Sequence, residues 1–307
     1  MAAPDQIVIE SAAPKAEPPG KPTAMTDKRL LFATVPVALE FPDEMSADIA
    51  GVLCGEYESG YFGEGVTVLD IGANVGSFTI WANMRWPHST IHAYEPHPET
   101  FKTLVQNVGS LPNVVCHDQA VYPDAASHQM FYSRYPGDGE SGLVAYIGRT
   151  FESLPQDRLV PVPTIHPRDL PRCDVVKIDV EGGEASILEN MDLTGVSLIL
   201  LEYQDLENRR SIERRLQPDF VCEFEDSFPW TRILPGTEYR KDLAGNSYGH
   251  LFFANKRTNR LRKLAGVESM QRSAWPVQPS GLSLRQLLTI LPGAAMRALK
   301  SRLRRLF

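Results

Sequence analysis

The stretch VTVLDIGANVGSFTI, residues 66–80, limits the folds open to this chain more than any other. Val66, Val68, Leu69 and Ile71 form an apolar, partly β-branched run with a glycine on either side, which predicts a buried strand. A glycine-rich turn follows, and the residues after it predict a helix. We expect a binding site at this turn, because open α/β sheets bind ligands where strands end.

The spacing of the glycines indicates which ligand the turn would bind. Gly72 and Gly76 have no side chain, so a ligand could approach the main chain and the helix amides closely. A nicotinamide dinucleotide turn has the spacing G-x-G-x-x-G, but here Asp70 occupies the first position. A carboxylate would repel a pyrophosphate, yet it could bind an ammonium group or, through water, a ribose. The pattern therefore favours a cationic nucleoside without phosphate, S-adenosylmethionine.

A second acidic residue supports this interpretation. Residues 90–94 predict the next strand, and Glu95 follows it about 20 residues after the glycines, where doubly wound folds place an acid on a ribose diol. A carboxylate can accept two hydroxyl donors at once. We therefore expect Glu95 to bind the ribose.

The strand-turn-helix pattern occurs again at residues 173–191, CDVVKIDVEGGEASILENM. Residues 175–180 predict a buried strand and Gly182-Gly183 a turn, and a helix follows with Ile187, Leu188 and Met191 on its apolar face. Residues 196–203 predict another strand, apolar enough to be buried on both faces. Strand followed by helix, twice over, predicts a parallel sheet with crossover helices.

Shorter patterns predict the remaining elements. Helices are expected at residues 46–54, 78–84, 98–108 and 211–216, and a short strand at 114–116. Residues 128–135 and 143–150 alternate enough for a hairpin, and 220–224 and 250–254 are expected to pair as closing antiparallel strands.

Composition divides the chain into three parts. Residues 1–28 are rich in Ala, Pro, Lys and Glu and predict a disordered tail; residues 29–255 form the predicted domain, and 256–307 a basic extension. That extension has twelve Lys or Arg and one Glu, a net charge of +11, which leaves −18 for residues 1–255 within the total of −7. An acidic body argues against a nucleic-acid channel, whereas the extension could bind an anionic partner.

Residues 294–307 predict a basic amphipathic helix with Met296, Leu299, Leu303 and Leu306 on one face. Such a helix could lie on an anionic membrane surface. Docking on its own domain or on a partner subunit is the favoured interpretation, because so few apolar side chains would enter a bilayer.

The cellular compartment is suggested by the cysteines and by the N-terminus. The four cysteines are scattered without a metal-like spacing, the N-terminus lacks the pattern of a secretion signal, and no apolar stretch is long enough to span a bilayer. A cytoplasmic protein is expected, with peripheral contact to the inner face of the membrane as an option.

The motifs VLDIGANVGSFTI, AYEPHPETFKTLVQNV and DVVKIDVEGGEASILENM together resemble the FkbM-type family of S-adenosylmethionine-dependent methyltransferases. The resemblance covers about residues 55–255. It implies an α/β class I methyltransferase fold, which is Rossmann-like, with a seven-stranded, mostly parallel sheet, one reversed strand and helices on both faces. It also implies methylation of a hydroxyl oxygen on a sugar, glycan or natural product.

The resemblance assigns roles to individual residues. Gly72, Asn74 and Gly76 would contact the methionine part of the cofactor, and Glu95 the ribose. Asp118 and Ala120 would lie at the adenine. Asp179 and Glu181 would face the transferred methyl group.

The reaction needs a group that removes the proton of the hydroxyl. Asp179, Glu181 and Glu202 follow or end two neighbouring strands, so they are the candidate catalytic residues. They could act as a carboxylate base, which is favoured, or hold a divalent metal. His250 and His166 are alternative bases.

Two other functions remain open. The acceptor could be a nucleic-acid base recruited by the basic extension, although the chain has no Pro-Pro-Tyr-type motif. The chain could also be a non-catalytic, membrane-associated scaffold, since a fold alone does not establish a function.

Overall fold

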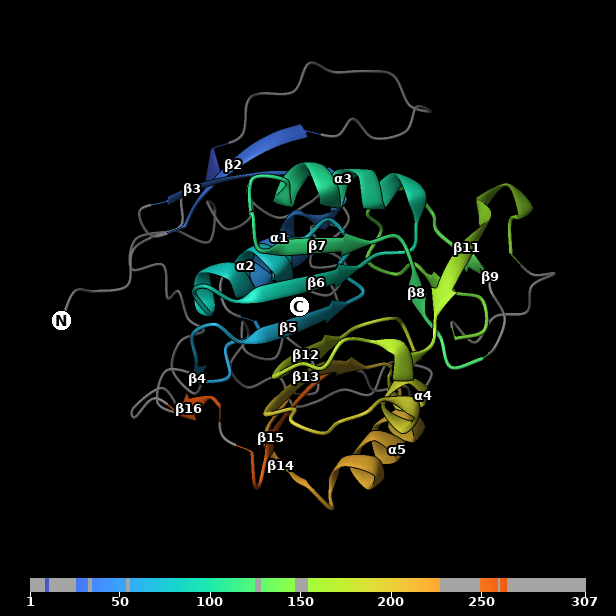
Figure 1. Cartoon of the computed structure of the whole chain (residues 1–307). Coiled ribbons are helices and arrows are strands. Elements are labelled where there is room, and N and C mark those ends of the chain that lie inside the picture. The colour runs from blue at the N-terminus through green and yellow to red at the C-terminus, as the bar shows by residue number, and fades with distance from the viewer. Residues whose placement is uncertain are drawn as a thin grey trace, which may run out of the picture.

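A computed structural model of the chain describes residues 9–10, 26–32, 35–53, 56–124, 128–146, 154–226, 249–258 and 260–263. Its centre is a seven-stranded sheet in the order β14-β15-β13-β12-β5-β6-β7. The strands are β5 (Thr67–Ile71), β6 (Thr90–Tyr94), β7 (Val114–His117), β12 (Val175–Ile178), β13 (Leu198–Tyr203), β14 (Phe220–Asp226) and β15 (Gly249–Asn255). Figure 1 shows them stacked from β7 to β14.

The sheet is parallel except at one strand. The pairs β5–β6, β6–β7, β5–β12 and β12–β13 are parallel, whereas β15 runs antiparallel to both β13 and β14. The predicted seven-stranded, mostly parallel sheet with one reversed strand is therefore confirmed. The carboxyl ends of β5, β6, β12 and β13 meet at one edge.

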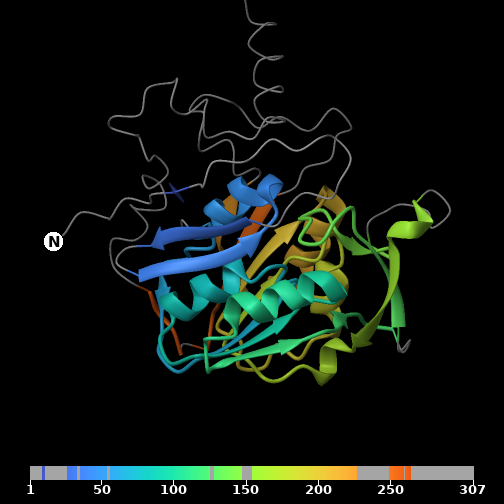
Figure 2. The same ribbon diagram turned by 90° about the horizontal axis from the view of Figure 1, so that it is seen from above.

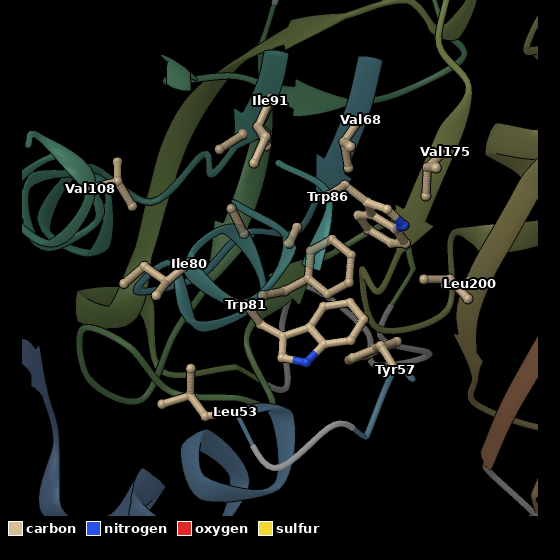
Figure 3. Packing of buried hydrophobic residues seen from close by; sticks show 14 of the residues in the cluster. Leu53, Tyr57, Val68, Ile80, Trp81, Trp86, Ile91, Val108, Val175 and Leu200 are labelled. Carbon is tan, nitrogen blue, oxygen red and sulfur yellow. The ribbon is translucent and has the colours of Figure 1, made fainter. Parts of the chain in front are cut away.

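Helices cover both faces of this sheet because strand side chains alternate between them. They are α1 (Ser46–Leu53), α2 (Ser77–Arg85), α3 (Pro98–Val108), α4 (Glu184–Asn190) and α5 (Leu206–Leu216). Leu198 and Leu200 of β13 belong to the core under α1, α2 and α3, whereas Ile199 and Leu201 belong to the core under α4 and α5. Figure 3 shows the first core, in which Trp81 and Trp86 lie close together.

A smaller sheet lies beyond the carboxyl ends of β6 and β7 (Figure 1). Its order is β10-β9-β11-β8, and its strands are β8 (Ala120–Val121), β9 (His128–Tyr132), β10 (Gly142–Leu143) and β11 (Leu159–Ile165). The hairpin of β9 and β10 is confirmed. Strand β11 is missing from the prediction because Pro161 and Pro163 argue against a strand, yet both pair opposite β9.

Short elements complete the described structure. Strands β1 (Ile9–Glu10), β2 (Thr26–Phe32) and β3 (Val35–Phe41) form an antiparallel sheet, and β3 lies beside α3 in Figure 2. Strand β4 (Tyr61–Phe62) pairs with β16 (Arg262–Lys263). Three 3-10 turns are η1 (Asp43–Met45), η3 (Gln156–Arg158) and η4 (Pro167–Asp169).

Most predicted elements form close to their expected positions. The predicted strand at 90–94 and helix at 98–108 match β6 and α3, whereas the charged helix predicted at 211–216 begins earlier, at Leu206, because Asp205 caps it. Strand β1 and the start of β2 fall within the predicted tail, and β16 within the predicted extension; the remaining residues of the tail and of 264–307 lie outside the described residues. No helix in the described ranges is long and apolar enough to cross a membrane.

Candidate active site

A cavity of about 1060 Å³ opens at the carboxyl ends of β5, β6, β12 and β13. Helix α1 and residues 134–146 also contribute to its walls. Among the described residues, the charged side chains of the lining are mostly carboxylates, with Lys177 and Arg134 as its lysine and arginine. The carboxylates are Asp48, Glu56, Glu95, Asp138, Glu140, Asp179, Glu181, Glu202 and Asp205. Such a cavity attracts cations and repels phosphates.

The glycine turn forms one wall, through Gly72 and Asn74. Both glycines are in the left-handed region, with φ of 82° at Gly72 and 93° at Gly76. A Cβ atom on Gly72 would lie 1.9 Å from the Asp179 carbonyl oxygen, and one on Gly76 would lie 2.9 Å from Leu104. Both glycines are therefore needed for packing within the protein, and Gly72 in addition exposes its main chain to the cavity. Gly76 lies behind the lining.

Glu95 lies in the cavity opposite the turn, 5% exposed. Its Oε2 accepts the Asn74 amide at 3.1 Å and its Oε1 the His97 amide at 2.8 Å. Each oxygen keeps a second acceptor position. Burial raises the pKa of Glu95 to about 7, against the effect of the two amides.

Asp70 lies beneath the cavity and is fully buried, so it is not part of the lining. It accepts the Thr79 hydroxyl at 2.6 Å and faces Lys177 Nζ at 3.5 Å. Lys177 is opposite Asp70 on β12; it donates to the Gly72 carbonyl at 2.7 Å and lies 3.3 Å from Asp179. Burial alone would lower the pKa of Lys177, but Asp179 and Asp70 raise it. Asp70 therefore acts on the cavity through its ion pair with Lys177, which lines it.

The motif at residues 173–191 places two carboxylates, Asp179 and Glu181, in the cavity lining. Asp179 lines the cavity and accepts the Tyr57 hydroxyl at 3.4 Å. Glu181 also lines it, from a turn in which its own φ is 62°. Burial raises the pKa of Glu181 well above its usual value, and the neighbouring Asp179 and Glu184 carboxylates raise it further. A raised pKa makes Glu181 a stronger base than an ordinary carboxylate.

Glu184 supports that turn from within the protein and is fully buried. Its Oε1 accepts the amides of Val180 and Gly182, both at 3.1 Å, while its Oε2 has no partner in the described structure. Burial raises the pKa of Glu184 to about 7. Asn208 of α5 fixes the turn further by donating to the Gly182 carbonyl at 3.2 Å.

Glu202 of β13 lines the far side of the cavity and pairs across the sheet with His250 of β15. His250 Nε2 lies 3.5 Å from Glu202 and 3.3 Å from Glu56. Burial, with Asp179 and Glu181, raises the pKa of Glu202 well above its usual value. His250 is 3% exposed and lies behind the two glutamates, outside the lining.

Three further candidates lie apart from or at the edge of this group. Ala120 lines the cavity, but the neighbouring Asp118 is exposed outside it. His166 accepts the Arg168 amide at 3.1 Å and caps η4 away from the cavity, so the structure does not place it as a base there. The described residues contain no group of three or more His, Cys, Asp or Glu arranged to hold a metal ion.

The sequence interpretation missed several lining residues. Asp48, Glu56, Arg134 and Glu140 come from segments that contain neither motif. Glu56 is followed in the sequence by Tyr57, which also lines the cavity. Glu58 lies outside the lining and pairs with Arg85 at 2.8 Å, and Tyr61 lies in β4.

The chain matches the family described as "Methyltransferase FkbM domain" over residues 70–229. It is 28% identical over 160 residues to Methyltransferase 1 of Beauveria bassiana, a match that covers 44% of this chain and 62% of the relative. It is 25% identical over 174 residues to 31-O-demethyl-FK506 methyltransferase FkbM of Streptomyces tacrolimicus, covering 47% and 67%.

A third relative is the hexuronic acid methyltransferase AglP of Haloferax volcanii, 26% identical over 136 residues, covering 43% of this chain and 54% of the relative. The chain thus spans roughly half to two thirds of the length of these relatives. The family match covers more than half of the chain and includes the glycine turn, Glu95 and all of residues 173–191. This chain belongs to the FkbM methyltransferase domain family.

Proposed function

We propose that the protein transfers a methyl group from S-adenosylmethionine to a hydroxyl oxygen of a sugar, glycan or natural product. The observation that supports this most is the cavity itself, which is lined by the glycine turn and Glu95 and by the carboxylates Asp179, Glu181 and Glu202. Its volume, about 1060 Å³, is at the upper end of small-molecule pockets and suits two ligands side by side.

The first half of the cavity fits the cofactor. Glu95 has an acceptor position free on each oxygen, which suits the two ribose hydroxyls. The main chain at Gly72 and Asn74 would lie along the methionine part, and Ala120 would border the adenine. The acidic lining suits a sulfonium cation. When bound, the cofactor would supply an activated methyl group.

The second half would bind the acceptor and receive its proton. As the acceptor oxygen bonds to the methyl carbon, the carbon–sulfur bond breaks and the hydroxyl proton passes to a carboxylate. Asp179 lies 3.3 Å from Lys177 and accepts the Tyr57 hydroxyl at 3.4 Å, so part of its hydrogen-bonding capacity is already used within the protein. Burial raises the pKa values of Glu181 and Glu202, so the ionised form of either is a stronger base than an ordinary carboxylate and would take the proton.

The acceptor class is supported by the relatives. One of them is named for oxygen methylation of a natural product and another for a hexuronic acid. The acidic lining is also unfavourable for the phosphates of a nucleic acid. A hydroxyl acceptor therefore fits both sources better than a nucleic-acid base does.

Thermal unfolding of the full chain with and without S-adenosylhomocysteine, the demethylated product, tests the cofactor site. Saturating product at about 100 times its Kd should stabilise the fold by about 2.7 kcal/mol. Glu95→Gln should weaken binding by roughly tenfold or more, since hydrogen bonds to a charged group are lost. Glu99→Gln, an exposed position on α3, is the matched control and should bind like the natural chain. An unchanged affinity in Glu95→Gln would remove Glu95 from the site.

A further inference from the structure

His250 is an ionisable side chain beside the cavity to which the proposed function gives no role. It lies on β15, opposite Glu202 of β13, and is 3% exposed. Residues opposite one another on antiparallel strands project from the same face of the sheet, and the next pair on this face is Leu200 with Phe252, in the core under α1. His250 and Glu202 therefore meet where this face of the sheet reaches the cavity.

Two carboxylates of the cavity lining lie close to one nitrogen of this histidine. Nε2 of His250 is 3.3 Å from Glu56 Oε1 and 3.5 Å from Glu202 Oε2. Ionised carboxylate oxygens only accept hydrogen bonds, so an Nε2 without a proton would set its lone pair against theirs. Burial by itself disfavours an imidazolium, but two carboxylates at this distance favour it. The arrangement thus suits a positively charged His250 between two ionised glutamates.

Aromatic packing holds the imidazole ring in this position. The ring of Tyr57 lies 5.5 Å from that of His250 at an angle of 86°, and Tyr57 packs in turn against Phe252. Burial raises the pKa of Tyr57 well above its usual value, so its hydroxyl is neutral. On β14, the residue opposite His250 is Asp226. A ring fixed in this way keeps Nε2 directed at the two glutamates.

The three candidate bases differ in the cations that face them. Asp179 is paired with Lys177 at 3.3 Å. Burial and acidic neighbours, Asp179 first, raise the pKa of Glu181. Glu202 has acidic neighbours too, but the imidazole of His250 lies 3.5 Å from it, and its charge also acts on Lys177. Glu202 therefore combines a buried, strongly basic carboxylate with a neighbour that can hold it ionised.

We propose that His250 is a positioning residue that holds Glu202 ionised near neutral pH, and that Glu202 is thereby the carboxylate that removes the proton of the acceptor hydroxyl. As the oxygen–carbon bond forms and the carbon–sulfur bond breaks, this proton passes to Glu202, and it leaves to water after the products depart. His250 keeps its own proton throughout. The inference rests on the proposed function and names its base.

Nuclear magnetic resonance of the full chain tests the pair without an acceptor. With nitrogen-15 in its histidines, the ring signals of His250, assigned from the backbone of β15, report its protonation. His250 should be doubly protonated at pH 7 and should lose its proton with a midpoint above the ordinary value of about 6.5. Glu202→Gln should lower that midpoint by about one pH unit or more, because one opposite charge is removed. Glu189→Gln removes the same charge from an exposed position of α4 and should leave the midpoint unchanged.

Carbon-13 in the glutamate carboxyl groups tests Glu202 itself. Its carboxyl should be ionised at pH 7 in the natural chain and protonated at that pH in His250→Gln, because burial and the acidic neighbours then act on it unopposed. Glu181 should be protonated at pH 7 in both chains and serves as the comparison. Stabilisation by S-adenosylhomocysteine shows that His250→Gln is folded. If this variant does not fold, the midpoint of His250 in Glu202→Gln decides.

Each outcome decides a different statement. A neutral His250 at pH 7, an unchanged midpoint in Glu202→Gln, a protonated Glu202 in the natural chain, or a Glu202 that stays ionised in His250→Gln overturns the role of His250. An ionised Glu181 at pH 7 overturns the selection of Glu202 as the base. A chain that S-adenosylhomocysteine does not stabilise overturns the proposed function, and the base with it, whatever the protonation of the pair.

Discussion

Two buried glutamates of this protein have similar pKa values but different roles, because one faces the cavity and the other does not. Glu95 and Glu184 are both buried, and each accepts two backbone amides. Burial outweighs those amides, so the pKa of each is raised to about 7. Glu95 faces the cavity whereas Glu184 faces the protein, so the same shift should affect binding in one case and stability in the other.

The pH dependence of cofactor binding should follow Glu95. The ionised carboxylate accepts two hydroxyls, and protonation removes part of this capacity. We expect the affinity for S-adenosylhomocysteine to fall as the pH decreases from 8 to 6, through the pKa of about 7. Calorimetry over this range checks it. Glu95→Gln should show weaker binding without that step, and a step of the same size in the variant would assign it to another group.

The pH dependence of stability should reflect Glu184. A carboxyl group with a higher pKa in the folded state makes its full contribution below the unfolded value, near 4.5, and loses it as the pH rises through about 7. The loss is roughly 3 kcal/mol. Urea unfolding from pH 4.5 to 8 should show a decline that is smaller by about this amount in Glu184→Gln. Equal declines would contradict the pKa assigned to Glu184.

At the scale of elements, the site depends on how β5 and β12 are held together. The main chain of the glycine turn packs against the Asp179 carbonyl, and Lys177 crosses from β12 to the Gly72 carbonyl. The glycine turn of residues 66–80 and the motif at residues 173–191, about 100 residues apart in the sequence, thus form one structural unit. Each contact offers a separate test.

The first test adds a methyl group at the turn. Gly72→Ala places a Cβ 1.9 Å from the Asp179 carbonyl oxygen at a φ of 82°, so β12 must move. We expect a loss of more than about 2 kcal/mol in the free energy of unfolding, and loss of stabilisation by S-adenosylhomocysteine. Gly65→Ala, with φ of 61° and open space around the new Cβ, is the control and should cost about 1 kcal/mol. Similar losses in both would show that packing at Gly72 is unimportant.

The second test removes the buried cation. Lys177→Met leaves Asp70 fully buried without its partner, which should cost about 3–5 kcal/mol of the free energy of unfolding. Adding Asp70→Asn should recover part of this loss. Lys102→Met, which removes an exposed ion pair with Glu99, should change it by less than about 1 kcal/mol. Chemical denaturation of the four chains measures these values, and a cost near zero for Lys177→Met would rule out the proposed bridge.

At the scale of the whole molecule, an acidic domain is joined to a basic C-terminal sequence. The cavity lining uses described residues from Met45 to Asp205, and the last described strand, β16, ends at Lys263. The predicted amphipathic helix at 294–307 lies outside the described residues. The site and the basic sequence are therefore expected to be separable.

Removal of residues 264–307 tests this separation. The shortened chain should keep its response to S-adenosylhomocysteine, because every described residue that lines the cavity lies before this segment. Sedimentation with vesicles rich in phosphatidylserine should then distinguish the two interpretations of the helix. Binding by the full chain alone, weakened by salt, would indicate membrane contact. No binding by either chain, together with a change of molecular mass on deletion, would indicate contact with another subunit.

The sequence by itself determined the sheet, the family and much of the cavity. Alternating or continuous apolar runs specify β5, β6, β12 and β13. Side chains at the carboxyl ends of parallel strands meet at one edge of the sheet. For this reason the sequence could predict that Glu95, Asp179, Glu181 and Glu202 line the cavity. The tertiary structure alone decided which wall each side chain joins. Asp70 points into the protein toward Lys177, Asp118 points outward, and Asp48 and Glu140 enter from segments without a motif. Strand periodicity fixes where a residue ends up along a strand, but the direction and partner of its side chain depend on what packs against it from elsewhere in the chain.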